Sequence, residues 1–328
     1  MGEGSGAASA RTGRIVRRRV TLAPILRPMT HAVITSPGLW SYAVFAAVAA
    51  VALLVLAVRG DWHRERGLDK LLLLGPLFYA APLAAFATQH FTQTASIAAL
   101  VPAWLPWHHL WAWFVGGCFI AGALSLITGV RTRLAARLLA LVFFLFVLLM
   151  DAPGWLHQPH NRFALALAFR ELAFSGGALA LAAALAPDRS RRSARLQAAI
   201  AKYFLAIPIL FYGFEQLLHG NFVSGVPLKL LTPAGLFGHA VWTYLAAVIY
   251  LIVACMLVAN QRARTAVTCL GLTVLFLVLV VYVPMLAAQP ASLNRFNFMA
   301  DTLMFAGAVF LLAGSLATAQ PRTAAATP

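Results

Sequence analysis

Hydrophobic residues run along this chain in long stretches that short polar gaps separate. Residues 39–58 and 267–288 carry no charged side chain, and each stretch is long enough to cross a bilayer as a helix. Stretches of this kind predict nine transmembrane helices, at 38–58, 71–89, 108–130, 136–154, 164–186, 198–218, 238–259, 267–287 and 302–319. The pattern therefore predicts an all-α, multi-pass membrane protein.

The polar gaps alternate between basic and nearly neutral. Lys and Arg gather in every second gap, at 59–70, 131–137, 188–197 and 260–265. The gap at 90–107 has no basic residue, and the others hold one each: Arg162, Lys229 and Arg295. Because cytoplasmic loops are enriched in Lys and Arg, we expect the basic gaps to face the cytoplasm. The basic residues at 11–27 depart from this scheme, since nine crossings place them outside.

Composition supports the membrane class. The 328 residues are 62% hydrophobic, which is more apolar surface than a soluble domain of this size can bury. A net charge of +16 would suit nucleic acid, but its confinement to the gaps indicates the lipid bilayer as partner and no nucleic acid. The three cysteines lie in apolar segments without CxxC spacing, so we expect small buried side chains.

Part of the sequence recurs 131 residues further on. The matches include His-x-x-Trp at 108 and 239, Arg-x-Arg at 131 and 262, proline at 153 and 284, and Gln-Pro at 158 and 289. Asn-Arg-Phe follows at 161 and 294, after a two-residue insertion. Such an ordered series predicts a tandem duplication with four helices in each unit. Four crossings return the chain to its starting side, so the two four-helix bundles should be parallel repeats about an axis along the membrane normal.

The duplication divides the chain into six parts. We expect a basic, flexible tail at 1–37, an extra transmembrane helix with a basic loop at 38–70, a first four-helix unit at 71–187, a basic linker at 188–197, a second four-helix unit at 198–320 and a C-terminal tail at 321–328.

Four motifs characterise each unit. A polar, aromatic-rich turn ends the first helix (Phe86 to His90; Phe214 to His219), and Arg-x-Arg-x-Ala follows the second. The third helix ends at proline, and the fourth carries "FSGGALALAAAL" or "FAGAVFLLAGSLA". With these motifs each unit resembles the DoxX-like family of small four-helix membrane proteins. The resemblance implies an accessory, non-catalytic subunit of a quinone-linked oxidoreductase in the cell inner membrane, with quinone as ligand and an oxidoreductase subunit as partner. This chain departs from the family by fusing two units and adding a helix.

Ionisable side chains gather near the predicted outer ends of the spans. Together they are the candidates for a polar ligand site near the outer face: Glu215, His219, His90, His108, His239, His157, His160, Glu171, Asp151, Asp301, Arg162 and Arg295. Because ionisable groups are costly inside a bilayer, they usually line a bundle interior or a wet cavity. Glu215 and His219 are four residues apart on one helix. Their pairing would suit proton exchange, or would only close the helix end.

Other polar groups also allow two interpretations. His157 and His160 could bind a metal or haem iron, or could be interfacial side chains. Each of Arg162 and Arg295 needs an anionic partner, for which Asp301, Asp151, a lipid phosphate or an anionic ligand would serve.

Two further groups lie at the same face. Arg170 and Glu171 are adjacent in sequence, so we expect Arg170 to extend outward and Glu171 inward, with separate partners. The tryptophans between 104 and 113 are an interfacial belt or a stacking surface for a quinone.

Three functions remain open from the sequence. The first is an accessory membrane subunit that binds quinone near the outer face. The second is a transporter or permease for a small solute or lipid. The third is a structural assembly protein without ligand chemistry.

Overall fold

The computed structural model describes residues 38–220, 222–223, 226–227 and 239–317. The predicted tails at 1–37 and 321–328, and Lys229, lie outside the described residues. Within the described part, nine helical segments are long and apolar enough to cross a membrane. The predicted fold class is therefore confirmed, and the protein is a multi-pass integral membrane protein embedded in a lipid bilayer.

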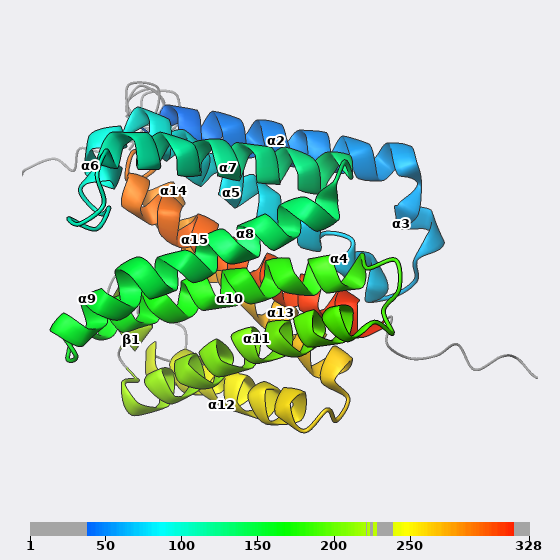
Figure 1. Ribbon diagram of the computed structural model, residues 1–328. Helices are drawn as coiled ribbons and strands as arrows, with labels where there is room; N and C mark the ends of the chain where they lie inside the picture. Colours follow the sequence, from blue (N-terminus) through cyan, green and yellow to red (C-terminus); the bar gives the residue numbers. More distant parts are fainter. Residues whose placement is uncertain (1–37, 221, 224–225, 228–238, 318–328) are drawn as a thin grey trace, which may run out of the picture.

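The helices follow the chain order shown in Figure 1. The first unit and the helices before it comprise α2 (Leu39–Arg59), α3 (Asp61–Arg64), α4 (Asp69–Leu72), α5 (Gly75–Thr92), α6 (Thr94–Ala98), α7 (His108–Thr128), α8 (Thr132–Phe146), η1 (Val147–Asp151), α9 (Ala152–His157) and α10 (Arg162–Ala184). The remainder comprises α11 (Arg192–Leu218), β1 (Phe222–Val223), β2 (Val226–Pro227), α12 (His239–Val258), α13 (Ala263–Leu277), η3 (Val278–Tyr282), α14 (Val283–Ala288) and α15 (Leu293–Ala317). The strands β1 and β2 form one short antiparallel pair.

The last span begins earlier than the sequence pattern predicts. We expected it at 302–319, whereas α15 starts at Leu293. Arg295, Asn297 and Asp301 lower the hydropathy of its first turns, but their side chains bond to groups of neighbouring helices or turns. A helix that satisfies its polar side chains in this way can continue into the membrane.

The fourth helices of the two units, α10 and α15, pack against each other at the centre of the molecule. Within each unit the helices pack in chain order, α5 on α7 on α8 on α10, and α11 on α12 on α13 on α15. The units also interlock, because α11 packs on α10 and α5 packs on α15. One hydrophobic core therefore runs through both units, while the extra helix α2 lies outside it against α5.

Close helix contacts at the centre depend on glycine. A Cβ on Gly307 of α15 would lie 2.6 Å from the backbone nitrogen of Tyr79 on α5. A Cβ on Gly176 of α10 would lie 2.9 Å from the Cβ of Phe204 on α11. Small residues let membrane helices approach this closely. Each glycine therefore allows the fourth helix of one unit to pack closely against the first helix of the other.

Backbone irregularities recur between the two units. The third span of each unit is interrupted by a five-residue π-helical turn, η1 and η3, just before Pro153 and Pro284. The residue before each third span, Arg131 or Arg262, has a positive φ of 50° or 46°. These features repeat at the offset seen in the sequence, as a tandem duplication predicts.

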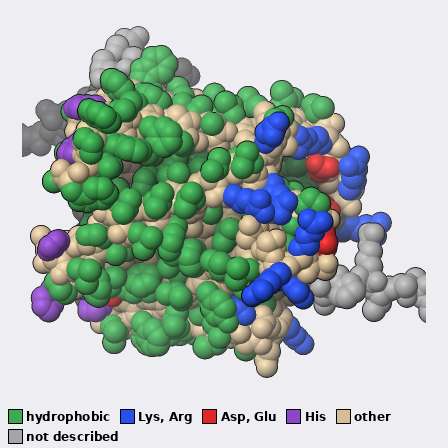
Figure 2. Space-filling view, in the orientation of Figure 1, with side chains coloured by type: hydrophobic (Ala, Val, Ile, Leu, Met, Phe, Trp, Pro, Cys, Tyr) green, Lys and Arg blue, Asp and Glu red, His purple; other side chains and the backbone are tan. Residues whose placement is uncertain are grey.

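The ends of the molecule differ in charge. Figure 2 shows Lys and Arg gathered at one end and the visible His side chains at the other, with hydrophobic side chains between. This is the separation that the alternating polar gaps predict. We refer to the two ends as the basic end and the histidine end.

The cysteines differ from the prediction. Cys255 and Cys269 are exposed and Cys118 is half-buried, so the expectation that all three are buried is wrong. Thiols are apolar enough to face lipid, and no packing constraint forces them inward.

Candidate functional site

An ion-pair network joins α10 to α15 inside the membrane. Arg170 donates from Nη1 to Asp301 Oδ2 at 2.5 Å and from Nη2 to Glu171 Oε1 at 2.7 Å. Arg170 lies eight residues into α10, which is about 12 Å along the helix axis. Charges at such a depth are retained where they pair or where they serve a function.

The expected directions of Arg170 and Glu171 were wrong. We predicted that adjacent residues on a helix would point to separate partners, with Arg170 extending outward. Instead the guanidinium folds back to Glu171 and also reaches across to Asp301. Arg170 and Asp301 are 131 residues apart, so they occupy matching positions of the two fourth helices and carry opposite charges there.

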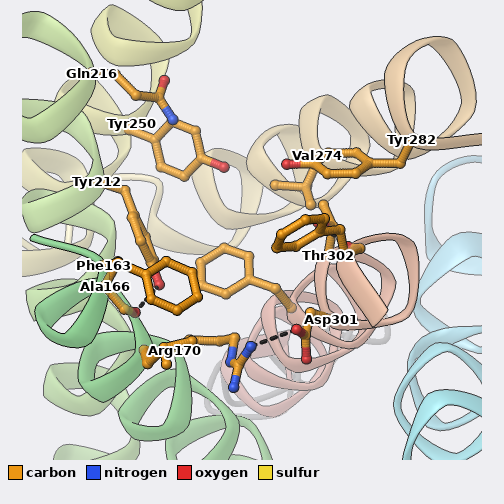
Figure 3. A pocket seen from close by; sticks show the side chains of 13 residues that line it. Phe163, Ala166, Arg170, Tyr212, Gln216, Tyr250, Val274, Tyr282, Asp301 and Thr302 are labelled. Carbon is orange, nitrogen blue, oxygen red and sulfur yellow. Dashed lines mark hydrogen bonds and ion pairs between the residues drawn. The ribbon is translucent and has the colours of Figure 1, made fainter. Parts of the chain in front are cut away.

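A cavity of about 100 Å³ lies beside this network. Helices α10, α11, α12, α13 and α15 and the π-helical turn η3 surround it (Figure 3). Its polar lining comprises Arg170, Asp301, Thr302, Gln216, Tyr212, Tyr250 and Tyr282. Rings of Phe163, Phe298 and Phe305 complete the wall. The lining residues of α10 and α15 come from the helix halves nearer the histidine end.

Polar groups aim into this cavity. The Tyr212 hydroxyl donates to the Ala166 carbonyl oxygen at 2.8 Å. In Figure 3 the hydroxyls of Tyr250 and Tyr282 point toward each other across the space. Gln216 is only 4% exposed, and its Oε1 has no hydrogen-bond partner within the described part of the chain. Buried polar atoms are nearly always bonded, and in Figure 3 the nitrogen of this amide lies nearer Tyr250 and the cavity than its oxygen does.

A second ion pair joins α10 to α11 nearer the histidine end. Arg162 donates from Nε to Glu215 Oε1 at 2.5 Å. His219 Nδ1 is 3.6 Å from Glu215 Oε2, which is too long for a hydrogen bond. The carboxylate thus lies near its predicted neighbour His219, but its closer partner is Arg162, which the sequence did not predict.

The carboxylates expected for the two outer arginines, Asp301 and Asp151, are not their partners. We predicted Asp301, Asp151, a lipid phosphate or an anionic ligand. Arg162 pairs with Glu215, and Arg295 Nη1 donates to the Met285 carbonyl oxygen at 2.8 Å. The reason is that α11 and α14 approach the starts of α10 and α15, which the sequence alone does not reveal.

The other candidate residues do not join these pairs. His90 is buried between α5 and α7, where Nδ1 lies 2.9 Å from the Ala112 carbonyl oxygen. Asp151 lies in η1, and its buried Oδ2 has no partner among the described residues. The remaining histidines lie at helix ends or in a turn: His108, His157 and His160.

His239 begins α12, but its side chain lies outside the described residues. In the described part, no three His, Cys, Asp or Glu side chains gather in a way that could hold a metal ion.

Sequence reasoning missed most of the cavity. Tyr212 and Gln216 come from α11, Tyr250 from α12 and Tyr282 from η3, and they follow no shared motif. One signal was present for Arg170, because sliding the chain by 131 residues sets it opposite Asp301.

Comparison with protein families, with curated proteins and with solved structures gives no match for this chain.

Proposed function

We propose that this protein is an accessory membrane subunit of a quinone-linked oxidoreductase, and that it binds the quinone ring in the cavity beside Arg170. The observation that carries the proposal is a cavity at membrane depth whose lining combines Tyr212, Tyr250 and Tyr282 with Gln216 and Arg170. The resemblance of both units, 71–187 and 198–320, to the DoxX-like family supports the same assignment. The protein would lie in the cell inner membrane, beside an oxidoreductase subunit that exchanges electrons with the bound quinone.

The chemistry of the lining suits a quinone. The hydroxyls of Tyr250 and Tyr282 can donate to the quinone carbonyl oxygens, and the Gln216 amide nitrogen, which faces Tyr250 in Figure 3, is a further donor. The Arg170 guanidinium would stabilise negative charge on a partly reduced ring. A cavity of about 100 Å³ is on the scale of an engineered cavity of roughly 150 Å³ that binds benzene. It therefore suits a single ring whose tail stays in the lipid.

Quinone binding by the detergent-solubilised protein tests this proposal. Tyr250→Phe and Gln216→Leu each remove one hydrogen-bonding group, which should weaken binding of a short-tailed benzoquinone roughly fivefold. Tyr203→Phe is the matched control, because Tyr203 is exposed on the outer side of α11 and its change should leave affinity unaltered. Saturable binding that none of these substitutions changes would place the quinone elsewhere, and no saturable binding would overturn the proposal.

One observation favours a second candidate, a permease for a small solute. Another cavity, of about 270 Å³, lies at the basic end. Between the two cavities α10 and α15 cross with Gly177 against Ala308, so a solute could pass only if these helices separate. Uptake of a small solute into vesicles that contain the purified protein tests this candidate, and uptake no faster than into empty vesicles would overturn it.

A further inference from the structure

The cavity at the basic end is a groove between α2 and the rest of the protein. The last turns of α2, α7, α10 and α15 and the first turns of α5 surround its volume of about 270 Å³. Its walls are almost entirely apolar, with Val55, Leu77, Leu181 and Leu311 among them. The charged side chains of the lining, Arg59 and Asp61, belong to the end of α2 and the start of α3.

The groove widens toward the basic end. At Gly307 the helix α15 lies directly against the α5 backbone. Seven residues later, a Cβ on Gly314 would meet no atom within 4 Å, and Gly314 lines the groove. The contact between the two helices continues to the start of α5, where a Cβ on Gly75 would lie 3.4 Å from the Leu311 backbone nitrogen. Beyond this contact α15 borders open space, and α2 lies over that space with little of its own surface buried. An apolar space of this kind inside a bilayer is accessible to lipid chains.

The charge at the mouth of the groove favours an anionic occupant. Arg59 is exposed and uses Nη2 to donate to the Thr128 carbonyl oxygen at 2.6 Å, and its guanidinium has further N–H groups that can donate to an anion. The carboxylate of Asp61 is neutralised by Arg64 at 3.2 Å. Arg59 belongs to the end of the molecule at which Lys and Arg side chains gather (Figure 2). Basic pockets between membrane helices on this side of a bilayer suit acidic lipid headgroups.

We propose that this groove binds one anionic phospholipid, with an acyl chain between α2, α5 and α15 and its phosphate on Arg59. The bound lipid fills the space that the protein leaves open under α2, and so fastens this helix to the two units. Such a lipid would also occupy the basic end of any solute path between the two cavities. The assignment does not depend on quinone binding, since it concerns different residues at the opposite end of the spans.

Native mass spectrometry of the whole protein tests the assignment. The protein is stripped of lipid and incubated with equal amounts of phosphatidylglycerol and phosphatidylcholine of identical chains. We expect one phosphatidylglycerol to be retained in preference to phosphatidylcholine. Gly314→Leu should abolish its retention by filling the groove, while Gly117→Leu should not, because Gly117 is a helix glycine in equally open surroundings outside the groove. Ala52→Leu on α2 fills the same groove from its other wall.

The headgroup contact has its own pair of variants. Arg59→Gln should lower the preference for phosphatidylglycerol roughly fivefold, as expected for one basic residue at a membrane surface. Arg66→Gln removes the same charge from an exposed position at the same end and should leave the preference unchanged. Equal retention of the two lipids by the unaltered protein overturns the proposal. So does undiminished retention in both Gly314→Leu and Ala52→Leu.

Discussion

The ion pair between Arg170 and Asp301 should hold the two units together with a measurable coupling energy. The perturbation is a double-mutant cycle of Arg170→Gln, Asp301→Asn and the two combined. Two charges about 4 Å apart interact by about 4 kcal/mol at an effective dielectric constant of 20. Glu171 shares the guanidinium, and 26% of the Arg170 side chain is exposed, so we expect a coupling of about 2 kcal/mol.

Reversible unfolding in mixed micelles, followed by circular dichroism, measures this coupling. The control cycle uses Arg64→Gln and Asp61→Asn, an exposed pair at 3.2 Å in the basic loop. That pair should show a coupling of about 0.3 kcal/mol. The unfolding free-energy changes of the two single variants are added and compared with that of the double variant. If they agree to within about 0.5 kcal/mol, the two side chains do not interact, and the claim that this pair joins the units fails.

Three further changes test the packing and the orientation of the fold. Gly307→Ala should lower the free energy of unfolding by about 1–3 kcal/mol through overpacking, whereas Gly314→Ala on the same helix should not, and equal effects would contradict the close contact. Glu215→Gln should cost about 1 kcal/mol in the same unfolding measurement, because 37% of its partner arginine's side chain is exposed; no change would show that the pair is not formed. In a cysteine-free background, single cysteines at Ser190 and His160 should react with a membrane-impermeant thiol reagent from opposite sides of the membrane, and labelling from one side would refute the orientation.

The sequence predicted the spans but not the contacts between them. The stretch at 39–58 was recognisable because it carries no charge, and α2 spans Leu39–Arg59. The start of α15 was missed because Arg295 and Asp301 resemble loop residues until their partners on other helices are known. Periodicity reports which residues share a helix, but tertiary packing decides which helix face meets which neighbour.

For the candidate site, too, the sequence predicted individual residues but not the contacts between them. Arg170 and Glu171 were visible because they lie inside the predicted span 164–186, where charge is unusual. Their grouping was not, since the Arg170 guanidinium folds back to Glu171 and reaches Asp301 on a helix 131 residues away. Tyr250 and Tyr282 carried no signal, because a tyrosine in an apolar span is commonly a packing residue.

The claim that the tyrosine-lined cavity binds a quinone is tested most directly by photolabelling. The purified protein is irradiated with an azido-benzoquinone, and the modified peptides are identified by mass spectrometry. We expect labelling at Tyr212, Gln216 and Tyr250, which line the cavity from α11 and α12, and competition by unmodified quinone. Labelling confined to the exposed tryptophans between 104 and 113 would contradict the claim, because it would place the quinone on the surface of the protein.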